Sequence, residues 1–148
     1  MSELPVPDLF TEMYPYLSTV AGFKALAGDR LYPEVAPQDS ELPYAVMSMV
    51  GEVSNQHMGG AVSLVLRSYQ FDVYAEDSAT RGTLTGVIRD ALAGYRGNMG
   101  ETYIHGSIHD NTFFTFDLTV AGSESGTFRS IMQFRIWHTA SQPTQVVD

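Results

Sequence analysis

The sequence predicts an α+β domain with two layers: a mainly antiparallel β-sheet and helices packed on one of its faces. Residues 63–75 alternate between apolar and polar side chains and run directly into a helical pattern over residues 77–93. Residues 114–120 and 132–136 show the same alternation on either side of a glycine-rich turn, which is typical of an antiparallel hairpin with one apolar face. Together these patterns favour a sheet with one face buried under helices.

The first third of the chain is predicted to contain helices followed by a loop. Residues 7–28 have apolar side chains recurring on one helical face. Pro15 lies within this segment and should bend it or split it into two short helices. A short extended stretch over residues 29–33 follows, and then a proline-rich surface loop over residues 34–43.

The middle of the chain is predicted to form a strand, a loop, and the strand and helix described first. Residues 44–53 are rich in β-branched and aromatic residues and predict a strand. Residues 55–61 contain two adjacent glycines, so they form either a hairpin loop or the tip of a longer protruding hairpin. The helix begins near Asp77, whose carboxylate can accept backbone hydrogen bonds. The helix should cover the sheet with its apolar stripe, Leu84, Val87, Ile88, Ala91 and Leu92. After the helix, a short strand is predicted over residues 103–108.

The charge balance argues against a protein that grips nucleic acid. Seventeen acidic residues stand against eight basic ones, for a net charge of −9, whereas binding to phosphate backbones requires clustered Lys and Arg. The chain has no cysteine, which excludes disulfides and thiolate metal sites. The N-terminus predicts neither a signal peptide nor a membrane span. We expect one domain over residues 1–140 and a polar tail over residues 141–148.

Patterns that could indicate catalysis or ligand binding are incomplete. His105 and His109 have the spacing of a helical metal pair, but an extended backbone would hold them about 13 Å apart. In the loop 122–126, the central position of a nucleophile-elbow pattern is Glu124 instead of serine. The glycine-rich stretch 94–100 lacks the lysine and hydroxyl of a phosphate loop. The sequence therefore predicts no enzyme activity, no cofactor and no metal site.

Several short segments carry a family resemblance through their order and spacing. They are residues 25–33 (ALAGDRLYP), 36–38 (APQ), 42–44 (LPY) and 70–75 (QFDVYA), the last leading into a helix. In this arrangement the chain resembles the tail-completion family of tailed bacteriophages, the tail terminator proteins of long-tailed phages and related gene-transfer particles. The resemblance covers most of the chain, from the first predicted helix to the last strand.

The resemblance implies a virion structural protein. Such a subunit assembles into a ring, usually a hexamer, at the head-proximal end of the tail tube, and leaves a channel through which DNA passes without specific binding. Its implied partners are copies of itself, the tail tube protein and a head-side connector or completion protein, with assembly in the host cytoplasm and no membrane involved. The family supplies no catalytic residues. The acidic composition fits a channel that must not bind phosphates.

Two sets of residues are candidates for contacts in an assembly, one facing the channel and one contacting neighbouring subunits or the tube. Glu52, Asp72 and Asp117 are predicted on the polar sheet faces, where they could face the channel or simply be solvated. The loop 55–61 and the C-terminal tail are predicted to contact neighbouring subunits or the tube, because protruding segments become ordered against partners. The residues chosen there are Asn55, Gln56, His57, Met58 and Gln145.

Two alternative functions stay open at this stage. One is another head–tail connector subunit or a minor tail protein, which differs in its position on the tail. The other, from a different class, is a small ligand-binding or enzymatic α+β domain, which would have a deep pocket with converging polar groups.

Overall fold

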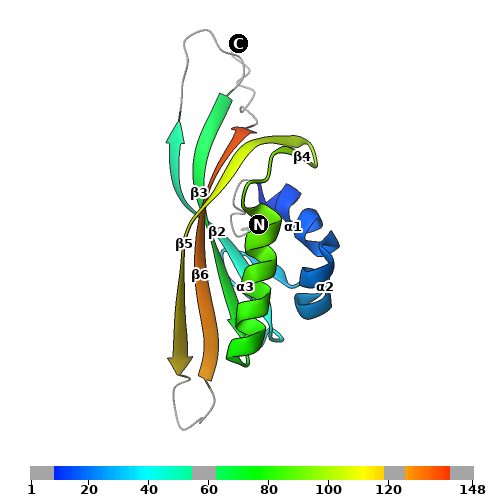
Figure 1. The fold of residues 1–148 in the computed structure, drawn as a ribbon, viewed down its shortest axis with the longest axis vertical. Helices are drawn as coiled ribbons and strands as arrows, with labels where there is room; N and C mark the ends of the chain where they lie inside the picture. The colour runs from blue at the N-terminus through cyan, green and yellow to red at the C-terminus, as the bar shows by residue number, and fades with distance from the viewer. Residues whose placement is uncertain (1–8, 55–62, 119–125, 141–148) are drawn as a thin grey trace, which may run out of the picture.

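The computed structural model describes residues 9–54, 63–118 and 126–140, and it confirms the α+β prediction. A long, curled sheet forms one layer, and the helices lie together on one side of it (Figure 1). Within the described residues, no helix is both long enough and apolar enough to cross a membrane. In chain order the elements are α1 (Phe10–Thr19), α2 (Ala21–Ala27), β1 (Leu31–Pro33), β2 (Tyr44–Ser54), β3 (Ser63–Ala75), α3 (Ser78–Leu92), β4 (Gly97–Met99), β5 (Thr102–Leu118) and β6 (Gly126–Ala140).

The sheet has six strands in the order β1-β2-β3-β6-β5-β4. Only β1 and β2 are parallel; the other neighbours are antiparallel. β6 pairs with β3 along thirteen consecutive positions, with Tyr69 opposite Phe134 near the middle. The hairpin predicted from the last third of the chain is therefore present as β5 and β6, and β6 occupies the centre of the sheet.

Helix α3 forms where the sequence predicts it. The Asp77 carboxylate accepts a hydrogen bond from the Thr80 backbone N–H at 2.7 Å, which satisfies a free amide of the first turn. This backbone hydrogen bond lowers the pKa of Asp77. Along the apolar stripe, Leu84, Ile88 and Leu92 are fully buried against the sheet.

The N-terminal helical segment is split as expected, but at Val20 instead of at Pro15. Pro15 lies inside α1, whereas Val20 adopts extended backbone angles (φ −72°, ψ 120°) and separates α1 from α2. The turn at Val20 brings Phe23 of α2 into the same core as α1. A Cβ atom at Gly22 would lie 2.8 Å from Val87 Cγ2, so glycine permits the close approach of α2 to α3.

Strand β5 is much longer than predicted. The stretches 103–108 and 114–120 were expected to be separate strands, but β5 runs without a break from Thr102 to Leu118. The register shifts between Ile104 and Gly106 and again between His109 and Asn111. Each shift inserts one extra residue and changes which side chains face the helices. Because the two bulges interrupt the alternation of apolar and polar residues, the sequence of one long strand reads as two short strands.

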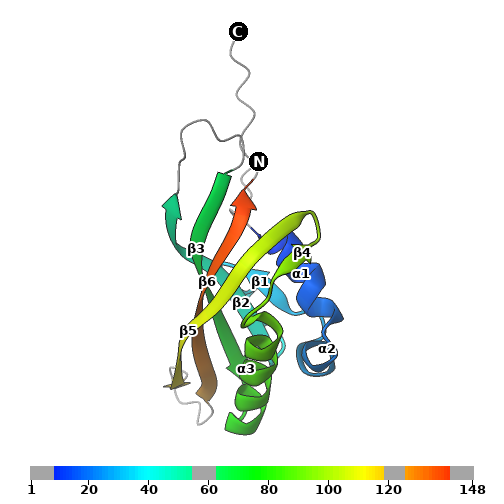
Figure 2. The same cartoon turned by 45° about the horizontal axis from the view of Figure 1, so that its top comes forward.

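The short strands β1 and β4 lie at the two ends of the sheet order, and the sequence did not predict β4. β4 and the start of β5 curl towards α1 (Figure 2). The contact is close, since a Cβ atom at Gly100 would lie 3.1 Å from Glu12 Cγ. Gly100 also has a positive φ of 60°, which favours glycine in the turn between β4 and β5.

The core lies between the helices and one face of the sheet, hereafter the helix-covered face. On β3 this face carries Tyr69, Phe71 and Val73, all 0% exposed, and the opposite, outer face carries Ser68, Gln70 and Asp72. The Phe71 and Phe134 rings meet edge to face with centroids 5.7 Å apart. Other fully buried large residues include Phe23, Met13, Leu17, Met47, Leu84, Ile88 and Leu92.

Candidate assembly surfaces

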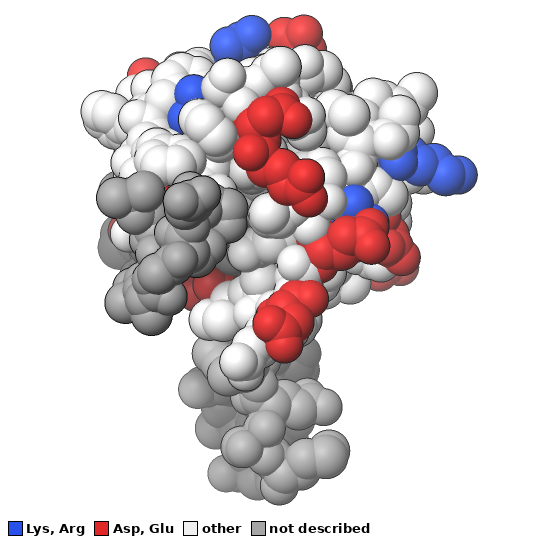
Figure 3. All heavy atoms as spheres, turned by 90° about the horizontal axis from the view of Figure 1, so that it is seen from below, with Lys and Arg blue, Asp and Glu red and all other residues white. Residues whose placement is uncertain are grey.

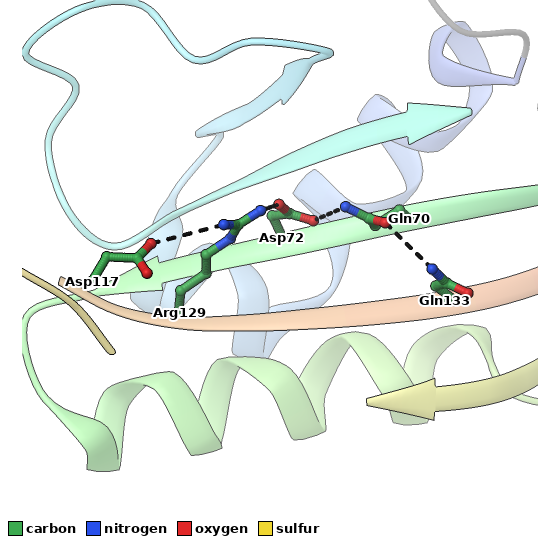
Figure 4. A network of polar contacts seen from close by, with 5 residues as sticks. All are labelled: Gln70, Asp72, Asp117, Arg129 and Gln133. Carbon is green, nitrogen blue, oxygen red and sulfur yellow. Dashed lines mark hydrogen bonds and ion pairs between the residues drawn. The ribbon is translucent and has the colours of Figure 1, made fainter. Parts of the chain in front are cut away.

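A chain of polar contacts crosses the outer face of the sheet (Figure 4). Arg129 on β6 forms an ion pair with Asp72 on β3 and lies 3.8 Å from the carboxylate of Asp117 on β5. Gln70 Nε2 donates to Asp72 Oδ1 at 2.8 Å, and Gln133 Nε2 donates to Gln70 Oε1 at 3.4 Å. The network therefore joins three adjacent strands, β3, β6 and β5.

Arg129 is the centre of this network. Desolvation alone would lower its pKa, but the hydrogen bond and the attraction to Asp72 outweigh that effect and raise the pKa of Arg129. The guanidinium also lies over the Tyr74 ring, 5.4 Å from its centroid. Arg129 is not among the site residues predicted from the sequence. The sequence does contain one signal for its position: Arg129 alternates with Ile131 and Gln133 along the strand, which places all three residues on the outer face.

Asp72 lies on the predicted face, but it is not exposed to solvent. Only 7% of the residue is accessible, because Arg129 and Gln70 contact its carboxylate. Asp117 lies on the same face and its side chain is 47% exposed. Of these two acids, therefore, Asp117 is the more accessible to a passing ligand.

Glu52 lies on the face of the sheet opposite to that of Asp72. A register shift between Met49 and Gly51 reverses the facing of β2 beyond Val50, so that Glu52 stands opposite Arg67 on the helix-covered face. Arg67 Nε donates to Glu52 Oε1 at 2.7 Å. The three predicted acids therefore do not form one surface.

The predicted contact residues lie outside the described residues. They are Asn55, Gln56, His57, Met58 and Gln145. The strands on either side of the first group, β2 and β3, pair antiparallel up to Ser54 opposite Val65. The hypothesis that these segments contact partners stays a prediction.

The histidine pair considered for metal binding is spread along β5. His105 is exposed, while His109 Nε2 lies 2.6 Å from Thr112 Oγ1. Across residues 9–54, 63–118 and 126–140, no three His, Cys, Asp or Glu side chains are grouped so that they could hold a metal ion. The described part of the chain therefore offers no metal centre to build on.

Large apolar side chains are exposed along β5. Phe113 is 58% exposed, Phe114 55%, Phe116 44% and Ile108 42%. They occupy both faces, since Phe113 and Ile108 are in register with the outer-face residues Ile131 and Arg135, while Phe114 is in register with Ser130, which bonds to α3. Exposed apolar residues gathered on one element mark an interaction surface.

Arg81 of α3 lies against this apolar stretch. Its guanidinium carbon is 5.0 Å from the Phe114 ring centroid and 5.3 Å from that of Phe128. One nitrogen, Nη1, donates to the Thr115 carbonyl at 3.0 Å. Among the described residues, Arg81 has no carboxylate within ion-pair distance, so it presents a positive charge beside the phenylalanines.

Acidic side chains are not confined to the sheet. Seen from below, they form a broken band across that end of the molecule, while most basic atoms lie near its rim (Figure 3). Glu76 and Asp77 at the start of α3 are both exposed. The excess negative charge of the chain is thus spread over several elements instead of being concentrated on the outer face.

The fold of this chain also occurs in a solved virion structure. It is similar to a chain in the solved virion of a native gene transfer agent particle, with a TM-score of 0.60, 16% sequence identity, and 86% of this chain and 91% of that chain covered. At this identity the similarity shows the shared fold. No curated protein sequence matches the chain.

The family follows from the sequence itself. The model of the family described as Tail completion protein gp17 matches residues 11–139, which is most of the chain. The chain therefore belongs to this family and is a structural protein of phage tails. This confirms the resemblance drawn from the short segments.

Proposed function

We propose that the chain is a tail terminator: copies of it form a ring, a hexamer, that ends the tail tube, joins it to the head-side connector and leaves a channel for DNA. The single observation that carries the proposal is the family match over residues 11–139. The exposed apolar side chains on β5 support it, since a subunit of an assembly keeps apolar surface for its neighbours.

We propose that the outer face contributes to the channel wall through Asp117 and Asp72. Two carboxylates share one guanidinium there, so the network keeps a net negative charge while Arg129 is held away from DNA. Such a surface repels phosphates weakly without binding them. Glu52, on the other face, would reach the channel only if both faces bordered it.

We also propose that the loop 55–61 and the tail 141–148 contact neighbouring subunits or the tube. Support comes from β2 and β3, which are long strands paired as far as Ser54 opposite Val65. Deletion of either segment should impair the formation of rings or of complete tails. Normal rings and normal tails after both deletions would contradict this assignment.

The ring itself is tested by mass. Light scattering on the purified protein, alone and with tail tube protein, should give a species of six times the 16.3 kDa chain mass. A protein that stays monomeric under both conditions would contradict the proposal.

The position on the tail separates the proposal from a connector or minor tail subunit. Gold-labelled antibody against the chain should decorate the head-proximal end of isolated tails. Decoration at the distal end, or along the tube, would favour a minor tail protein.

A further inference from the structure

Two margins of the sheet lack a flanking strand within the described chain, and they lie at opposite ends of the strand order. β4 pairs with β5 only at residues 102–104, so β5 continues to Leu118 with β6 on one side alone. β1 pairs with β2 only at residues 45–47, so β2 continues to Ser54 with β3 on one side alone. Open strand margins of this length are ready contact sites for another chain.

The first surface, called the β5 margin, consists of Ile108, Phe113, Phe114, Phe116 and Arg81. Its apolar residues occupy both faces of β5, which is typical of a strand that is covered on both sides. Within the described chain, α3 reaches only part of one side, at Arg81 and Thr115. The exposed parts of these side chains are accessible to another molecule.

The second surface, called the β2 margin, consists of Val35, Met49, Val50 and Glu34. Val35 is 63% exposed, Val50 49% and Met49 39%. Glu34 holds these residues together, because its N–H donates to the Met47 carbonyl at 2.9 Å and its carboxylate accepts from the Met49 N–H at 3.3 Å.

The two margins are opposite in charge. The β5 margin presents Arg81, which has no carboxylate partner among the described residues, whereas the two acids of β5, Asp110 and Asp117, lie within ion-pair distance of Arg135 and Arg129. The β2 margin presents the exposed Glu34 and continues into a loop with the exposed acids Asp39 and Glu41, of which Glu41 forms an ion pair with Arg30. A positive apolar surface and a negative apolar surface are complementary partners.

We propose that the β5 margin of one copy packs against the β2 margin of the next copy, and that this head-to-tail contact closes the ring. A ring requires two different complementary patches on each subunit, which the margins provide at opposite ends of the sheet. The contact covers the phenylalanines of β5 with Val35, Met49 and Val50, and brings Arg81 near Glu34 of the neighbour. This inference rests on the proposed ring and adds which surfaces form it.

Cross-linking tests the contact directly. The chain contains no cysteine, so introduced thiols are the only ones present. The double variant Phe113→Cys/Val50→Cys, treated with a short bismaleimide, should give a ladder of covalent multimers up to the ring. Each single variant should give none. The matched control Phe113→Cys/Asp90→Cys, which pairs the same margin with an exposed α3 position, should also give none.

The outcomes separate this inference from the ring itself. Rings of the expected mass without a ladder from the double variant would overturn the contact and keep the ring. Dimers from Phe113→Cys alone would show that like margins meet, and cross-links to tube protein would assign β5 to the tube; either overturns the inference. If the unmodified chain forms no multimer alone or on tail tubes, the proposed function fails first.

Charge exchange gives a second, independent test. Arg81→Glu and Glu34→Arg should each weaken assembly by about tenfold, because like charges then face each other. An equimolar mixture of the two variants should restore assembly, since alternating subunits place a carboxylate against a guanidinium at every contact. Arg89→Glu, an exposed α3 control, should assemble normally. A mixture that assembles no better than either variant would overturn the pairing of Arg81 with Glu34.

Discussion

β6 and the C-terminal part of β5 have the same alternation of large apolar side chains, yet they have opposite environments. Phe134 on β6 is 0% exposed, because α3 and the neighbouring strands cover it, whereas Phe114 on β5 is 55% exposed. The difference depends on where the helices lie and not on the residues themselves. Alternation therefore predicts which face of a strand is apolar, and only the packing of the whole chain decides whether that face is core or interface.

Truncation in the covered region should have the largest effect. Phe134→Ala removes a ring that packs edge to face on Phe71, and we expect a loss of about 4 kcal/mol in the free energy of unfolding. Urea unfolding followed by the fluorescence of the single tryptophan, Trp137, measures it. Because a ring couples unfolding to dissociation, several protein concentrations are needed. A loss below about 1 kcal/mol would contradict the assignment of Phe134 to the core.

The outer-face network should have an intermediate effect. Asp72→Ala leaves the largely buried Arg129 without its main partner, and we expect a loss of about 2 kcal/mol after allowance for the partial exposure of Arg129. The matched control is Gln133→Ala, which removes only the 3.4 Å hydrogen bond at the end of the network. Equal losses in the two variants would show that the ion pair contributes little beyond the amide contacts.

The N-cap of α3 should have a smaller effect that depends on pH. Asp77→Ala removes the acceptor of the Thr80 N–H, so the urea midpoint should fall at neutral pH. Because the pKa of Asp77 is lowered in the folded state, its stabilisation is present above the ordinary value of 3.8 and is lost as the pH falls through the folded value. Asp77→Ser keeps an acceptor oxygen and should lose this pH dependence while retaining most of the midpoint.

Truncation in the uncovered region should have the smallest effect on the isolated subunit. Phe113→Ala changes a side chain that is 58% exposed, and we expect less than about 0.5 kcal/mol in the free energy of unfolding at a concentration where the chain is monomeric. The same variant should weaken ring formation. A large loss in the monomer would show that β5 is already part of the subunit core, and the contrast with β6 would disappear.

The Asp117→Lys variant tests the channel proposal separately from folding. Asp117 is 47% exposed, and its distance of 3.8 Å from Arg129 is longer than a hydrogen bond. Because this contact is weak, reversing the charge of Asp117 should leave ring assembly intact. A positive charge at that place should slow the passage of DNA and lower infectivity. Unchanged infectivity with normal particles would argue that Asp117 does not face the channel.

The sequence by itself determined the elements with a clear period. The strand and helix over residues 63–93, the hairpin in the last third and the absence of clustered basic residues all follow from local spacing and composition. These properties depend on side chains near one another along the chain, so the order of residues is sufficient to reveal them. The family resemblance is of the same kind, and the family match confirms it.

The tertiary structure decided two things: which sheet face the side chains point to beyond each β-bulge, and which parts of each face the helices bury. The bulge at Val50 moved Glu52 away from Asp72, and the bulges in β5 joined two predicted strands into one. One extra residue reverses every later side chain, and no local pattern marks where that occurs. Likewise, Arg129 acquired its role only when β6 was placed between β3 and β5, where one guanidinium can reach acids on both neighbouring strands.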